Sequence, residues 1–164
     1  MGPNYVVRPR EIWRLIKRES AGNGITLERQ DMTISKIEDA IAAISRGDMV
    51  IVVDDEDREN EGDIIAASET ITPGQIAFMM NHARGLICVA MEGERMDELE
   101  LPLMVPRNTE FHKTAFTVSV DYIPDTTTGI SAQDRAKTVQ ALVTKGTKPE
   151  DFARWLNCKT LLPR

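Results

Sequence analysis

The sequence predicts an α/β protein of the α+β type, a layered sandwich in which helices flank a mixed β-sheet. Three observations lead to this fold class. Apolar, β-branched runs such as residues 49–53 are typical of buried strands. Amphipathic segments with capping signals, such as residues 35–47, are typical of helices. The expected order is helix, strand, strand, helix, strand, short helix, strand, helix, and its adjacent strands do not fit a regular parallel β-α alternation.

The composition is that of an ordinary globular chain. Its 164 residues, of which 41% are hydrophobic and 28% charged, are enough for one domain with a sizeable core. The net charge of −6 argues against general nucleic-acid binding, which requires a basic face. No apolar run approaches the roughly 18 residues of a membrane span, and we expect no signal peptide in residues 1–18. Cys88 and Cys158 are too few for a disulfide framework, so we expect a cytoplasmic protein.

The first half of the predicted domain begins with a helix. Ser35 and Glu38 have the spacing of a capping box, and Gly47 can terminate the helix that follows. Residues 49–53 and 64–67 are predicted strands on either side of a polar loop. The expected inward face of the helix consists of Ile37, Ala40, Ile41 and Ile44.

The middle of the chain predicts a second helix followed by a strand. Thr72 is the expected N-cap, with Gln75 completing the box, and Gly85 is expected to end the helix. The apolar run at residues 86–91 predicts a third buried strand. Cys88, inside this run, is by default a small hydrophobic residue.

The last third of the chain continues the alternation of helices and strands. Residues 92–99 have a short, charged helical pattern, and residues 115–122 alternate between apolar and polar side chains as a strand does. Ser131 and Asp134 predict the N-cap and an acidic third position of a further helix. Residues 149–156 predict a last short helix.

The most informative segment is the acidic loop at residues 54–63, in which seven of ten residues are acidic. It directly follows the predicted strand at residues 49–53. Hard cations such as Mg²⁺ prefer oxygen ligands, and the planar fork of Arg58 suits a phosphate or carboxylate. The alternative is a solvated acidic turn, because like charges at this density repel one another.

Two other polar segments allow a functional and a structural interpretation. The hydroxyl-rich loop at residues 126–131 precedes a helix, so it either cradles a phosphate at the helix N-terminus or simply caps the helix. His112 lies in a polar loop, where a histidine is more often solvent-exposed than catalytic. The residues alone leave both questions open.

Four blocks of sequence together resemble the 3,4-dihydroxy-2-butanone 4-phosphate synthase family. The resemblance covers roughly residues 34–154, leaving residues 1–33 as an N-terminal extension and residues 155–164 as a tail that does not match. The blocks are Asp-Asp-Glu-Asp-Arg-Glu-Asn-Glu-Gly-Asp at 54–63, Gly-Leu-Ile-Cys at 85–88, Thr-Ala-Phe-Thr-Val at 114–118 and Thr-Gly-Ile-Ser-Ala-Gln-Asp-Arg at 128–135.

This resemblance implies an enzyme that converts D-ribulose 5-phosphate to 3,4-dihydroxy-2-butanone 4-phosphate and formate. It implies Mg²⁺ (or Mn²⁺) as cofactor, a sugar phosphate as the small-molecule partner, and a homodimer with active sites near the subunit interface. By position, Glu59 resembles the metal ligand, and Arg58, Glu59, Asp63 and Thr117 resemble the substrate-binding residues. Asp63 and Cys88 resemble catalytic residues, with Cys88 and Thr117 lining the pocket.

The resemblance ends after about Arg154. The family pattern continues there with a Pro-Gly-His segment and then a Gly-His-Thr-Glu segment that supplies a second metal ligand and part of the phosphate site. A catalytic Glu follows, and none of these is matched in residues 155–164. We therefore expect an incomplete domain that turns over poorly alone. The alternative is a catalytically impaired remnant that binds an intact homologous subunit.

Overall fold

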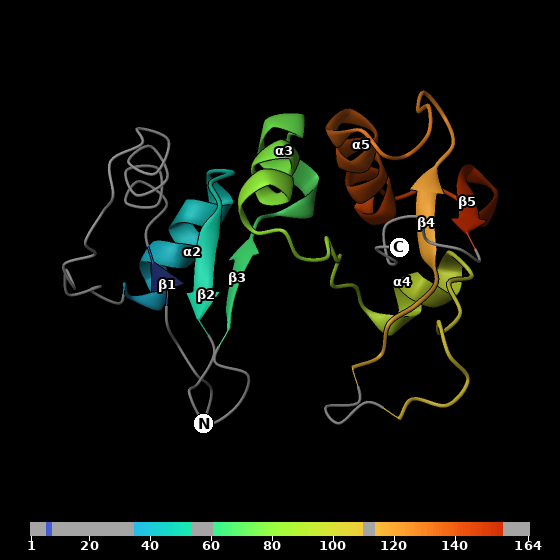
Figure 1. The fold of residues 1–164 in the computed structure, drawn as a ribbon, viewed down its shortest axis with the longest axis horizontal. Helices are drawn as coiled ribbons and strands as arrows, with labels where there is room; N and C mark the ends of the chain where they lie inside the picture. The colour runs from blue at the N-terminus through green and yellow to red at the C-terminus, as the bar shows by residue number, and fades with distance from the viewer. Residues whose placement is uncertain (1–5, 8–34, 54–60, 110–113, 156–164) are drawn as a thin grey trace. The chain divides into compact units, whose positions relative to one another are not determined.

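A computed structural model describes residues 6–7, 35–53, 61–109 and 114–155 of the chain. These residues divide into two compact units (Figure 1). Unit 1 comprises residues 1–70 and 79–84, and unit 2 comprises residues 71–78 and 85–164. The α+β class is confirmed, and within the described ranges the strands form two small antiparallel sheets.

The sheet of unit 1 has the strand order β1 (Val6–Val7), β2 (Val50–Val53) and β3 (Gly62–Ile65), all antiparallel. The register of β2 and β3 pairs Val50 with Ile65 and Val53 with Gly62. The acidic loop therefore connects two neighbouring strands, as the sequence predicts. Strand β1 lies within the predicted N-terminal extension, and the sequence did not indicate its pairing with β2.

Helix α2 (Ile37–Ser45) lies beside β2 (Figure 1). The contact between them is made through small side chains. Ala40 and Ala43 are buried with Val50, and Gly47 ends the helix with a left-handed φ of 81°.

Two predictions for helix α2 were wrong, the second of them in part. The N-cap is Lys36, without a side-chain cap bond, so Ser35 and Glu38 are out of frame for a capping box. The predicted inward face was wrong for Ile37 and Ile41, which are 48% and 59% exposed, and was confirmed for Ala40, which is buried, and for Ile44, which packs against the buried cluster.

Unit 2 is built on an antiparallel pair of strands, β4 (Ser119–Tyr122) and β5 (Phe152–Trp155). The predicted last helix at residues 149–156 was wrong: a 3-10 turn, η2 (Pro149–Asp151), leads directly into β5. Strand pairing outweighs the local helical pattern here, because it buries Phe152 beside Tyr122 with ring centroids 5.6 Å apart.

Three helices complete the described chain: α3 (Pro73–His82), α4 (Gly93–Glu98) and α5 (Ala132–Val143), and a 3-10 turn, η1 (Ser68–Thr70), precedes α3. The capping box of α3 is confirmed, since the Gln75 N–H donates to Thr72 Oγ1 at 3.2 Å and the Thr72 N–H to Gln75 Oε1 at 2.9 Å. Gly85 does not end α3, because Arg84 already takes the left-handed φ of 57°. The main buried cluster of unit 2 consists of Leu99, Leu101, Ala141, Leu142 and Phe152.

The predicted strand at residues 86–91 was also wrong. In the structure this segment is irregular, although Val89 and Met91 pack on the core of unit 2. Leu86 is 57% exposed, and Cys88 is exposed rather than buried. An apolar run shows that some side chains are buried, but it does not show whether a neighbouring strand is available to pair with the backbone.

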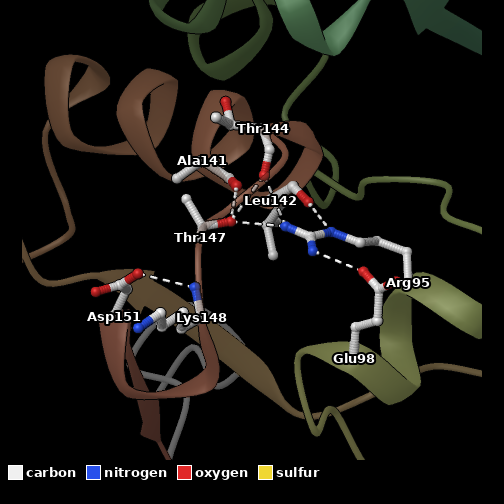
Figure 2. A network of polar contacts seen from close by, with 8 residues as sticks. All are labelled: Arg95, Glu98, Ala141, Leu142, Thr144, Thr147, Lys148 and Asp151. Carbon is white, nitrogen blue, oxygen red and sulfur yellow. Dashed lines mark hydrogen bonds and ion pairs between the residues drawn. The ribbon is translucent and has the colours of Figure 1, made fainter.

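Arg95 of α4 binds the C-terminal end of α5 (Figure 2). Its Nε donates to the Leu142 carbonyl at 3.1 Å, and one terminal nitrogen donates to the Thr144 carbonyl at 2.8 Å and the Thr147 hydroxyl at 2.6 Å. The other terminal nitrogen pairs with Glu98 at 2.8 Å. Helix α5 has no basic residue in its own last turn, so Arg95 supplies the positive charge that its exposed carbonyls favour.

None of the helices in the described ranges combines the length and hydropathy of a membrane span.

Candidate functional site

The site residues predicted from sequence are distributed over both units. Arg58 and Glu59 lie outside the described residues. Asp63 is exposed on β3 of unit 1, opposite Val52 on β2. Cys88 and Thr117 belong to unit 2. Each side chain is therefore described within its own unit.

The carboxylates at the start of β3 are accessible. Glu61 immediately precedes the strand, and both Glu61 and Asp63 are exposed. Exposed carboxylate oxygens are the donor type that Mg²⁺ prefers, so these residues fit a magnesium site chemically. Within the described ranges, no three His, Cys, Asp or Glu side chains gather closely enough to hold a metal.

Thr117 lies in a short antiparallel pairing just before β4. It faces Leu103 across an isolated bridge and is half-buried, and its Oγ1 donates to the Val118 carbonyl at 3.3 Å. The predicted strand at residues 115–122 is thus regular only from Ser119 to Tyr122. Cys88 is exposed in the irregular segment that follows α3.

The hydroxyl-rich loop before α5 is organised by a carboxylate of the protein itself. Ser131 is the N-cap, as predicted, and its Oγ accepts the Asp134 N–H at 3.0 Å. Asp134, only 3% exposed, turns back into the loop. Its Oδ2 accepts from the Thr127 hydroxyl at 2.8 Å, the Thr127 N–H at 3.3 Å and the Gly129 N–H at 3.2 Å.

This arrangement favours helix capping over phosphate binding at the loop. The backbone N–H groups of Thr127 and Gly129 already donate to the Asp134 carboxylate. The negative charge of this carboxylate would repel a phosphate placed beside it. The sequence indicated Ser131 as the cap and Asp134 as an acidic third position. It gave no sign that the Asp134 side chain would bond to residues five to seven positions earlier.

The same contacts lower the pKa of Asp134 below its ordinary value of 3.8. The hydrogen bond from the Thr127 hydroxyl is the main cause, and it is opposed by burial and assisted by the Thr127 backbone, Ser131 and Gly129. A hydrogen-bonded carboxylate is stabilised in its charged form. Asp134 is therefore ionised at neutral pH.

We expect Asp134 to contribute to acid unfolding. Because its folded pKa is lowered, its stabilisation is fully present above pH 3.8 and is lost as the pH falls through the folded pKa. Asp134→Asn should flatten the fall in urea midpoint in this acid range, and Thr127→Val should flatten it partly. An unchanged acid profile in Asp134→Asn would contradict the assignment.

Comparisons with known proteins agree on one family. The family model described as 3,4-dihydroxy-2-butanone 4-phosphate synthase matches residues 38–155. The 3,4-dihydroxy-2-butanone 4-phosphate synthase of Agrobacterium fabrum is 82% identical over 123 residues, which is 75% of this chain and 58% of that protein. The riboflavin biosynthesis protein RibBA of a Synechocystis species is 56% identical over 120 residues, covering 72% of this chain and 22% of that protein.

Solved structures give the same result for the fold. A 3,4-dihydroxy-2-butanone 4-phosphate synthase in complex with two magnesium ions matches with a TM-score of 0.71 and 47% identity, covering 74% of this chain and 56% of that one. The Candida albicans synthase matches with a TM-score of 0.64 and 45% identity over 73% of this chain and 58% of that one. The chain thus spans little more than half the length of these structures and of the Agrobacterium relative.

Proposed function

Because the chain belongs to the 3,4-dihydroxy-2-butanone 4-phosphate synthase family, we propose that it acts on D-ribulose 5-phosphate in riboflavin biosynthesis. The products would be 3,4-dihydroxy-2-butanone 4-phosphate and formate. The observation that carries this proposal is the 82% identity to the Agrobacterium enzyme over 123 residues. The family match at residues 38–155 supports a domain at residues 34–154, with residues 1–33 as an extension and 155–164 as a tail.

We propose that Glu59 holds Mg²⁺, or Mn²⁺ in its place, and also contacts the substrate. A magnesium-bound relative with 47% identity supports this cofactor, and the exposed carboxylates of Glu61 and Asp63 fit the same chemistry. When bound, the ion supplies Lewis-acid stabilisation of negative charge on substrate oxygens.

The remaining proposed roles belong to the side chains of the protein. Arg58 binds the substrate through its planar guanidinium, which suits a phosphate. Asp63, exposed on β3, contacts the substrate and moves protons as general acid and base. Cys88 and Thr117, both in unit 2, would line the substrate pocket, with Cys88 taking part in the reaction and Thr117 contacting the substrate.

We propose that the protein is a cytoplasmic homodimer. The family resemblance supports the dimer, and the low cysteine content supports the cytoplasmic location. Sedimentation of the purified chain measures its oligomeric state. A dimer that persists on dilution supports the proposal, and a monomer at all concentrations contradicts it.

The test of activity is formate release from D-ribulose 5-phosphate with and without Mg²⁺. We expect Glu59→Ala to lower the rate by about 100-fold or to background, because loss of a metal ligand removes charge stabilisation. Glu69→Ala is the control, because Glu69 is an exposed carboxylate of unit 1 outside the acidic loop, and this variant should retain activity. Chelation should abolish formate release, and added Mg²⁺ or Mn²⁺ should restore it.

Formate production equal in wild type and Glu59→Ala would contradict the proposed metal ligand. A folded chain that releases no formate would instead favour a catalytically impaired protein that binds an intact homologous subunit. Mixing labelled chain with the intact Agrobacterium relative then measures that association directly.

A further inference from the structure

Strand β2 lies in the middle of the sheet of unit 1, between β1 and β3. Its sequence, Val-Ile-Val-Val at residues 50–53, consists only of β-branched apolar residues, and Met49 before it is also apolar. A run with high strand preference, no charge and no proline is the sequence signature of segments that pair with identical segments of other chains. Both edges of β2 therefore have to be occupied if the protein is to avoid such pairing.

The two edges of β2 are occupied by different parts of the chain. Strand β3 pairs with all four residues of β2. On the opposite edge, β1 pairs with two of them, with Val6 opposite Val52 and Val7 opposite Ile51. Strand β1 precedes residues 38–155, the part of the chain that matches the family model. This edge of β2 is therefore covered by a segment outside the family match.

The outer strands of this sheet are poor templates for a further strand. Strand β1 has two residues, and in the sequence Pro9 follows it closely, between Arg8 and Arg10. At the opposite edge, β3 begins with Gly62 and the exposed carboxylate of Asp63. Short edge strands, prolines and charged residues all prevent edge-to-edge pairing of sheets. Both outer strands have such features nearby, whereas β2 has none.

We propose that β1 is a guard strand, whose release lets β2 pair edge to edge with the β2 strand of a second copy of this chain. Two identical, uncharged strands can pair antiparallel about a two-fold axis without repulsion between like charges. The guard strand is held by few ladder bonds, because successive residues of an antiparallel strand bond alternately to one side and the other. Only one of Val6 and Val7 therefore directs its N–H at β2, and only one of Ile51 and Val52 directs its N–H at β1.

The test replaces both valines of β1 with proline in the full chain. Val6→Pro with Val7→Pro removes the backbone donor that faces β2, whichever residue carries it. Val6→Thr with Val7→Thr is the matched control, because threonine keeps the N–H and the strand preference. At low protein concentration, the amide of Ile51 or Val52 that bonds to β1 should exchange about fivefold faster in the proline variant, as expected for one lost hydrogen bond. The threonine variant should exchange like wild type.

Sedimentation velocity over a concentration series then measures pairing between copies. Wild type and the threonine variant should share the same species, whether monomer or dimer, so the result does not depend on the proposed function. The proline variant should form an additional, larger species as its concentration rises. In that species the β2 amide should regain its protection, because the second copy takes the place of β1.

Three results would each overturn the inference. The first is wild-type exchange of both Ile51 and Val52 in the proline variant. The second is faster exchange without the larger species, or with a larger species in which the β2 amide stays unprotected. The third is faster exchange also of the β2 amides that bond to β3, because β1 would then hold the whole sheet together and would not guard one edge of it.

Discussion

Replacing Gly129 with alanine should destabilise the protein by about 3 kcal/mol. Gly129 is buried in the loop before α5 and has a φ of 75°, which is costly for any residue with a Cβ. A Cβ placed there would also overlap the carboxylate of Asp121 on β4. Backbone strain and steric overlap therefore add in one substitution, and urea unfolding measures their sum.

Two other glycines of unit 2 separate these contributions. Gly146 has a φ of 97°, and no atom lies within 4 Å of the position that an alanine Cβ would take, so Gly146→Ala should cost only the backbone strain, about 1 kcal/mol. Gly85 has open space and no left-handed φ, so Gly85→Ala should change stability by less than about 0.5 kcal/mol. Equal losses for Gly129→Ala and Gly146→Ala would show that Asp121 does not contribute.

Arg95→Ala should lower the free energy of unfolding by about 3 kcal/mol. The substitution leaves the carbonyls of Leu142 and Thr144 without their charged donor and removes the positive charge at the end of α5. The Arg95 side chain is only 21% exposed, so water replaces these bonds incompletely. Arg95→Lys should recover a minority of the loss, because one ammonium cannot reproduce the guanidinium fork.

Arg46 provides the matched control for Arg95. It pairs with Asp48 at 3.1 Å, but the two side chains are 63% and 48% exposed. Such a surface pair contributes little, so Arg46→Ala should cost less than about 0.5 kcal/mol. Thermal and urea unfolding of the two alanine variants compare the partly buried Arg95 and the exposed Arg46 directly. Similar midpoints for both variants would contradict the role assigned to Arg95.

Most of the local capping signals in the sequence were reliable, although the capping box of Ser35 with Glu38 and the helix end at Gly85 were not. Thr72 with Gln75 and Ser131 with Asp134 form the predicted caps, and Gly47 terminates α2. Each depends only on neighbouring backbone, so the local sequence contains all the information required.

The failed strand and helix assignments depend on partners that are distant in sequence. Residues 152–155 form a strand because β4 is available beside them, whereas residues 86–91 are entirely apolar and yet form no strand. For the candidate site, Asp63 and Thr117 lie on or beside strands as expected, while their roles and those of Arg58, Glu59 and Cys88 remain predictions. No pattern in the sequence indicates the contacts of Arg95 with α5, because those residues lie 47 to 52 positions apart.

The strand pairings also set an order of folding during synthesis. Strands β2 and β3 pair residues nine to fifteen positions apart, so this hairpin can close soon after it leaves the ribosome. Strand β4 must wait for residues 152–155, which follow it by 30 to 36 positions. Until then Leu99, Leu101 and Leu142 lack the ring of Phe152. Until residues 152–155 have been synthesised, the nascent second unit therefore exposes an aggregation-prone apolar surface. A chaperone would bind this surface during that period.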